Sequence, residues 1–102
     1  MNRDVAATVA VSDEGILRLT GHIGYANADA MLPVSRSALV DGKVTQVDLS
    51  GLKASDSATL ALLLALAAEA QRGKHRLVMS GAPEGLRALA RLANAEKLLQ
   101  FS

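Results

Sequence analysis

Three polar residues that could take part in chemistry, Ser55, Asp56 and Ser57, lie between an apolar strand pattern and an apolar helix pattern. A helix N-terminus carries unsatisfied N–H groups and partial positive charge, which favour hydrogen-bond acceptors and anions. In open α/β sheets the functional crevice lies at the carboxyl ends of the strands, which is where this run falls. We therefore take Ser55 to Thr59 as the candidate site. The same residues also have a purely structural explanation, because Ser and Asp are preferred N-caps that stabilise a helix by about 1 kcal/mol each.

Signatures of catalysis and of metal binding are missing from the sequence. His22 and His75 lie far apart in the chain, and neither has the spacing of a metal ligand. There is no cysteine, which excludes disulfides and thiol catalysis. No nucleophile elbow, phosphate-binding loop or dinucleotide glycine pattern occurs. We therefore expect a protein that has no catalytic residues and needs no metal or cofactor.

The length predicts one domain over residues 1–102, and the order of strand and helix patterns makes it an α/β domain. Half of the residues are hydrophobic, but with one Tyr, one Phe and no Trp the core must be aliphatic. The net charge of +1 gives no attraction to nucleic acid. The N-terminus lacks the apolar run of a signal peptide, and residues 60–68 fall far short of the roughly 20 that span a membrane. We expect a cytoplasmic protein with no direct membrane insertion.

Hydrophobic periodicity and turn residues predict a mixed sheet with helices. The expected strands are residues 5–11, 16–20, 45–50 and 75–80, and the expected helices are residues 27–40, 59–72 and 83–93. The first two strands should form an antiparallel hairpin, and the return from the third strand to the fourth implies a parallel right-handed crossover. Pro33 predicts a kink or a later start in the first helix. We expect residues 51–54 to form a loop, and residues 98–101 to form a short strand or a packed tail.

The helix expected at residues 59–72 is apolar on two sides, whereas a helix on a sheet needs one apolar stripe. One stripe consists of Leu60, Leu63, Leu64 and Ala67. The other contains Leu62, Ala65 and Leu66, with Thr59 on its flank. A neighbouring helix of the same domain, such as residues 83–93, is the explanation that periodicity favours. The alternative is a partner protein that docks on Thr59, Leu62 and Leu66.

The C-terminal part of the chain, from Val47 onward, resembles the STAS domain. This is the fold of bacterial anti-sigma-factor antagonists and of the cytoplasmic domains of sulfate-type transporters. The likeness rests on Asp48-Leu49-Ser50, on the Asp56-Ser57 pair that runs into Leu60-Ala61-Leu62-Leu63-Leu64, and on Leu86-Arg87-Ala88-Leu89-Ala90. The greatest similarity is to the MlaB-type group, the small STAS subunits of Mla phospholipid-transport ABC complexes. The resemblance implies a small mixed β-sheet with helices packed mainly on one face.

The resemblance also implies roles for residues of the candidate site. Ser57 matches the serine that is phosphorylated in the D-S-[ST]-G-L motif of the antagonists, and it matches the residue that MlaB-type subunits use to dock on the ATPase. Ala58 and Thr59 stand where the motif has Ser or Thr and then Gly, which favours the transporter subunit. Asp56 would orient the loop beside Ser55, and Thr59, Leu62 and Leu66 would supply contact area.

The function that the resemblance implies is therefore a non-catalytic subunit of an inner-membrane phospholipid ABC transporter. It would bind and stabilise or regulate the ATPase, in a complex with permease and lipid-binding subunits that maintains outer-membrane lipid asymmetry. It would reach the membrane only through that complex. The alternative is an anti-sigma-factor antagonist that is switched by phosphorylation of Ser57.

Overall fold

The computed structural model describes residues 7–40, 42–54 and 56–101, which form one four-stranded sheet and its helices. The strands are β1 (Thr8–Val11), β2 (Ile16–His22), β3 (Gln46–Ala54) and β4 (Val78–Ser80), and they lie in the sheet in that order. β1 and β2 form the expected antiparallel hairpin, whereas β2, β3 and β4 run parallel to one another. The sheet is therefore mixed, as predicted.

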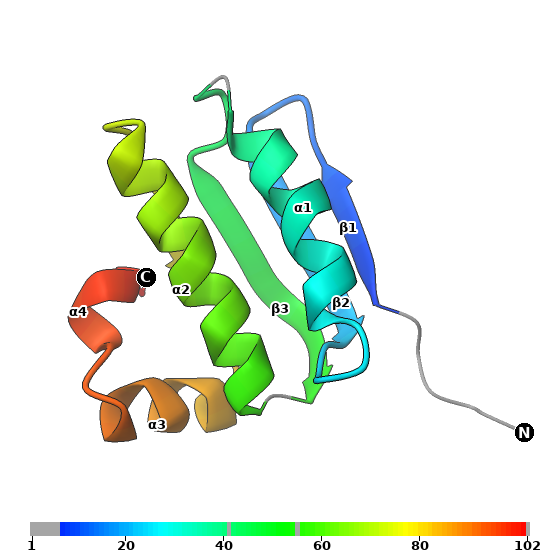
Figure 1. The fold of residues 1–102 in the computed structure, drawn as a ribbon, viewed down its shortest axis with the longest axis vertical. Coiled ribbons are helices and arrows are strands. Elements are labelled where there is room, and N and C mark those ends of the chain that lie inside the picture. Colours follow the sequence, from blue (N-terminus) through cyan, green and yellow to red (C-terminus); the bar gives the residue numbers. More distant parts are fainter. Residues whose placement is uncertain (1–6, 41, 55, 102) are drawn as a thin grey trace, which may run out of the picture.

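The helices α1 (Ala28–Leu39) and α2 (Ser57–Arg72) connect the parallel strands and lie side by side on one face of the sheet (Figure 1). The short helices α3 (Glu84–Leu92) and α4 (Glu96–Leu99) follow β4 and contact the flank of α2 that faces away from α1. Each parallel crossover starts its helix at the same end of the sheet. The loops before α1 and α2 are consequently neighbours.

Alternation along the strands explains why the helices cover only one face. Leu17 and Leu19 of β2 are buried while Arg18 between them is exposed, and Val47 and Leu49 of β3 are likewise buried. The buried side chains face α1 and α2. The opposite face is polar, with hydrogen-bonded pairs between Thr8 and Thr20, Arg18 and Asp48, and Gln46 and Ser80. The predicted arrangement with helices mainly on one face is confirmed.

Gly51 allows β3 to extend further than the sequence suggested. The β2–β3 register shifts where Thr20 pairs with Gly51, and a Cβ atom at Gly51 would come within 2.6 Å of Thr20 Cγ2. With glycine there, the strand continues to Ala54. The prediction that residues 51–54 form a loop was therefore wrong, and the first turn of α2 follows almost directly on the strand.

Several other element boundaries differ from the prediction. α1 contains Pro33 in its interior, so a later start for this helix was wrong. α2 begins at Ser57, two residues earlier than expected. β4 begins only at Val78, because the His75 N–H still donates to the Ala70 carbonyl (2.9 Å) at the end of α2. The C-terminal segment forms α4 and then a single bridge between Phe101 and Met79, a packed tail rather than a strand.

The two apolar sides of α2 are both covered by the domain itself. α1 packs along one side, and α3 and α4 contact the other. Leu63 and Leu66 are completely buried, and Leu62 and Ala70 nearly so. The neighbouring-helix explanation is thus confirmed, although α1 is the main neighbour. None of the helices in the described part of the chain combines the length and hydropathy that a membrane span requires.

Candidate functional site

The start of α2 is fixed by a capping box. The Asp56 side chain accepts hydrogen bonds from the backbone N–H groups of Ala58 (2.9 Å) and Thr59 (3.2 Å), and the Asp56 N–H donates to the Thr59 hydroxyl (3.1 Å). These bonds satisfy donors that a helix N-terminus would otherwise leave free. Asp56 is therefore the N-cap of α2, as the preference of Asp for that position indicated. Ser55 lies outside the described residues.

Thr59 joins the two loops of the site. Its side chain is fully buried, and its hydroxyl donates to the backbone carbonyl of Ile23 at 2.7 Å. Ile23 precedes α1, so this one hydroxyl ties the loop after β2 to the start of α2. A completely buried side chain offers no area to a partner. The prediction that Thr59 supplies contact area was wrong, because its hydroxyl has structural partners on both sides.

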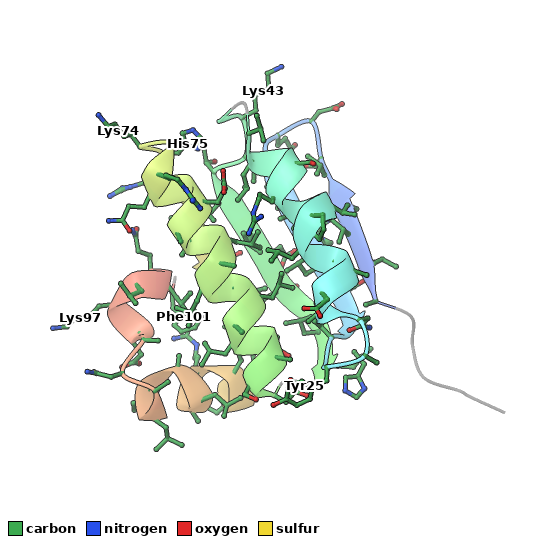
Figure 2. The ribbon with its side chains drawn as sticks, viewed as in Figure 1. Tyr25, Lys43, Lys74, His75, Lys97 and Phe101 are labelled. Atoms are coloured by element: carbon green, nitrogen blue, oxygen red, sulfur yellow. The ribbon has the colours of Figure 1, made fainter. Side chains whose placement is uncertain are left out.

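Ser57 is exposed at the first position of α2, and its hydroxyl lies 2.8 Å from the hydroxyl of Tyr25. Tyr25 is 78% exposed and comes from the loop between β2 and α1. Asn27 shapes that loop, because its side chain accepts from the Gly24 N–H (2.9 Å) and donates to the His22 carbonyl (2.9 Å). Figure 2 shows Tyr25 beside the first turn of α2, at the opposite end of the molecule from Lys43, Lys74 and His75.

A groove of about 390 Å³ lies between the first turns of α1 and α2. Most of its lining is apolar, and the polar groups are at Tyr25, Asp29 and Ser57. The apolar residues are Ala28 and Leu32 of α1, and Ala58, Ala61 and Leu62 of α2. The groove is in the size range of sites that hold a small ligand or a few side chains. The exposed Ser57–Tyr25 pair thus stands at the rim of an apolar hollow.

The residues that we predicted as partner contacts differ in whether a partner could reach them. Ser57 is exposed, and Leu62 lines the groove although only 3% of its surface is accessible. Leu66 is completely buried between α2 and its neighbours. As with Thr59, the prediction that Leu66 supplies contact area was wrong, because the second apolar side of α2 belongs to the core of the domain.

Sequence reasoning missed Tyr25, Asp29 and Ala61. The available signal was the loop from Gly21 to Gly24, because two glycines flank it and it follows a strand. We treated that strand only as the hairpin partner of the first one. Its parallel pairing with β3 is what places Tyr25 beside Ser57.

The chemistry available at the site is that of hydroxyl groups and carboxylates on a rigid helix start. In the described part of the chain, Tyr25 is the hydrogen-bond partner of the Ser57 hydroxyl, and no group of three His, Cys, Asp or Glu residues could hold a metal ion. A serine hydroxyl in this position can donate to or accept from a partner, and it can be a site of modification.

Comparison with known proteins identifies the family. The family model described as "Mlab, STAS domain" matches residues 6–100. No curated protein sequence matches the chain. Among solved structures, the anti-sigma factor antagonist SpoIIAA in its unphosphorylated form is similar with a TM-score of 0.71 and 16% identity, over 95% of this chain and 88% of the other. A putative anti-sigma factor antagonist from Thermotoga maritima gives a TM-score of 0.74 at 14% identity, over 93% of this chain and 84% of the other. At these identities the two structures support the fold alone. The family model spans nearly the whole chain, and this protein therefore belongs to the MlaB-type STAS domain family.

Proposed function

We propose that this chain is a non-catalytic STAS subunit that binds the ATPase of an Mla-type phospholipid ABC transporter and stabilises or regulates it. The observation that carries the proposal is the exposed Ser57 hydroxyl, held at a rigid helix start and hydrogen-bonded to the exposed Tyr25. The MlaB description of the matching family model supports this choice of partner. The permease and lipid-binding subunits of the complex would place the protein at the inner membrane.

The geometry suits a docking surface because the residues that hold the first turn are buried or half-buried, and the residues that must touch a partner are exposed. Asp56 and Thr59 hold the first turn of α2 through backbone hydrogen bonds. Ser57 and Tyr25 project from that frame. Tyrosine is enriched among residues that dominate binding energy at interfaces, because it combines a large apolar ring with a hydrogen-bonding group.

A second candidate function is an anti-sigma-factor antagonist that is switched by phosphorylation of Ser57. It is favoured by the exposure of the Ser57 hydroxyl at a helix N-terminus, together with a fold shared with two antagonist structures. A phosphate would add about −1.5 to −2 charges, which the helix N-terminus would stabilise. The Asp56 carboxylate one residue away would repel the same phosphate. The modification would therefore change this surface strongly.

The test is affinity purification of the tagged full chain from detergent-solubilised native cells, with bound proteins identified by mass spectrometry. We expect wild type to retain an ABC ATPase with its permease. Ser57→Asp should weaken ATPase binding at least about tenfold, a loss of about 1.4 kcal/mol of binding free energy, and so reduce the amount of ATPase recovered. Ser57→Ala should reduce it less, since it removes a hydroxyl without adding a charge. Ser37→Ala is the matched control, because Ser37 is an exposed serine toward the far end of α1.

The possible outcomes separate the two functions. Recovery of a soluble serine kinase with phosphate on Ser57, and no transporter subunits, would replace the transporter function by the signalling function. Undiminished ATPase recovery with both Ser57 variants would mean that Ser57 only starts the helix, and the site assignment would fail.

A further inference from the structure

The groove between α1 and α2 lies at the end of the helix pair that carries Ser57. Further along the pair, Ser35 and Leu39 of α1 and Leu66 of α2 are buried with at most 1% of their surface exposed. At the open end three positions of the lining are alanines, at 28, 58 and 61, which are too short to fill the space between the helices. Short side chains therefore leave a hollow at this end of the helix pair.

The charged group in the described lining of the groove is a carboxylate. Among the described residues, Asp29 in the first turn of α1 is the one carboxylate in the lining, and no Lys, Arg or His lines it. Asp29 is exposed, and within the described residues no basic side chain forms an ion pair with it. Asp48, by contrast, is bound by Arg18. An incoming cation would thus meet a carboxylate that is not already paired.

We propose that the groove receives an apolar side chain from the ATPase subunit, next to a Lys or Arg that pairs with Asp29. This inference rests on the proposed function and specifies the chemistry of the partner segment. The apolar lining of Leu32 and Leu62 takes the apolar side chain out of water, which is the main source of affinity in such a contact. Asp29 at the rim selects the neighbouring cation through complementary charge.

Tyr25 would form one wall of the contact with the partner side chain. Its hydroxyl is held by Ser57, so the exposed ring stands at the mouth of the groove. An apolar side chain that enters the groove would cover one side of that ring, and the Ser57 hydroxyl remains close enough to accept or donate a hydrogen bond. Ser57 and the groove therefore form a single contact region.

The test compares two substitutions on the same helix. Ala61→Phe fills the groove, whereas Ala68→Phe places the same side chain seven residues later, on nearly the same side of α2 and outside the groove. Both alanines are exposed, so neither change disturbs the core. We expect Ala61→Phe to weaken binding of the co-expressed, purified ATPase subunit at least about tenfold, and Ala68→Phe to bind as wild type does. Thermal denaturation confirms that both variants are folded.

The charge is tested by Asp29→Lys, with Glu84→Lys as the control. Both acids are exposed in the first turn of a helix, so the effect of each change on the helix is matched. We expect Asp29→Lys to weaken ATPase binding about tenfold at low salt and Glu84→Lys to leave it unchanged. Asp29→Asn should give an intermediate affinity that depends less on salt than the wild-type affinity does, since screening acts on the ion pair.

Failure of the inference can be distinguished from failure of the proposed function. If wild type does not bind the ATPase, the proposed function fails. If wild type binds and Ala61→Phe binds equally well, only the groove is excluded. Binding by Asp29→Lys at wild-type strength would remove the cation from the proposal. Loss of a dimer of this chain on Ala61→Phe substitution, measured by sedimentation, would assign the groove to a second copy and overturn the inference.

Discussion

At the scale of single residues, the hydroxyl of Thr59 shows how one buried polar group determines the geometry of the site. It donates to the Ile23 carbonyl and accepts from the Asp56 N–H. Burying a polar group costs free energy unless the group is hydrogen-bonded, and both bonds of this hydroxyl connect segments whose relative position the site needs. The exposed Ser57 and Tyr25 meet because Thr59, which no partner can reach, holds the two loops together.

Thr59→Val tests this role. Valine has nearly the same shape but leaves the Ile23 carbonyl and the Asp56 N–H without their partner, so we expect the free energy of unfolding to fall by about 2 kcal/mol. Thr59→Ser keeps the hydroxyl and should lose only about 1 kcal/mol, from the missing methyl group. Urea denaturation measures both values. Thr45→Val, at an exposed position, is the control. A loss for Thr59→Val no larger than that of the control would contradict the role.

At the scale of elements, α1 contains a proline at an interior position, where proline destabilises a helix. Pro33 is the sixth residue of α1, so it has no N–H to donate to the carbonyl of Asp29 one turn earlier. Its side chain is exposed and contributes little packing. The helix forms nevertheless, because its buried face, with Met31, Ser35 and Leu39, packs in the domain.

Pro33→Ala should therefore stabilise the protein. We expect the free energy of unfolding to rise by about 1–2 kcal/mol, since the restored helix hydrogen bond outweighs the added entropy of the unfolded chain. Thermal denaturation followed by circular dichroism measures the change. Val34→Ala, at the exposed neighbouring position, should leave the midpoint almost unchanged. An unchanged or lower midpoint for Pro33→Ala would mean that the proline is fully accommodated in α1.

Elements with a strong local signal could be predicted from the sequence, and those set by tertiary packing could not. The run from Leu60 to Leu64 shows that α2 is apolar on two sides, but periodicity does not reveal what covers each side. β3 extends past Gly51 because Thr20 lies across from it, a contact between distant parts of the chain. α4 is too short to produce a helical pattern.

The residues of the candidate site also fall into two groups, those that a local pattern identifies and those that tertiary packing brings together. Asp56 and Ser57 could be identified because a helix cap is a local pattern of adjacent residues. Tyr25, Asp29 and Ala61 could not, because their meeting depends on the parallel pairing of β2 with β3, which places two loops at one edge. The burial of Leu66 depends on α1, a helix more than twenty residues away in the sequence, and periodicity suggests a covering helix without identifying it.

At the scale of the whole molecule, the open face of the sheet makes stability depend on pH. The Asp48 carboxylate accepts from the Ser50 N–H (2.9 Å), from Arg18 (2.9 Å) and from the Ser50 hydroxyl (2.7 Å). These bonds, the Ser50 backbone bond first, lower the pKa of Asp48 from its ordinary value of 3.8. A lowered pKa in the folded state stabilises the protein above the unfolded pKa, and this stabilisation is lost as the pH falls through the folded pKa.

Asp48→Asn should remove that contribution. We expect the variant to unfold about 1 kcal/mol more easily than wild type at neutral pH, a value at the upper end for a partly exposed ion pair. The difference should shrink as the pH falls from 3.8 through the lowered pKa of Asp48 in the folded state, where the wild-type carboxyl also becomes neutral. Urea denaturation at several pH values tests this, with Asp13→Asn in the exposed β1–β2 turn as control. A difference that is independent of pH would show that the charge of Asp48 is not its cause.

The position of Tyr25 has a practical consequence. It is the only tyrosine of a chain without tryptophan, so nearly all the ultraviolet fluorescence of the protein comes from one phenol ring at the mouth of the groove. Titration with a synthetic peptide that lacks aromatic residues would therefore report occupancy of that groove directly, with no dye attached. The same fact makes absorbance a poor measure of concentration for any Tyr25 variant, whose amounts must be determined in another way.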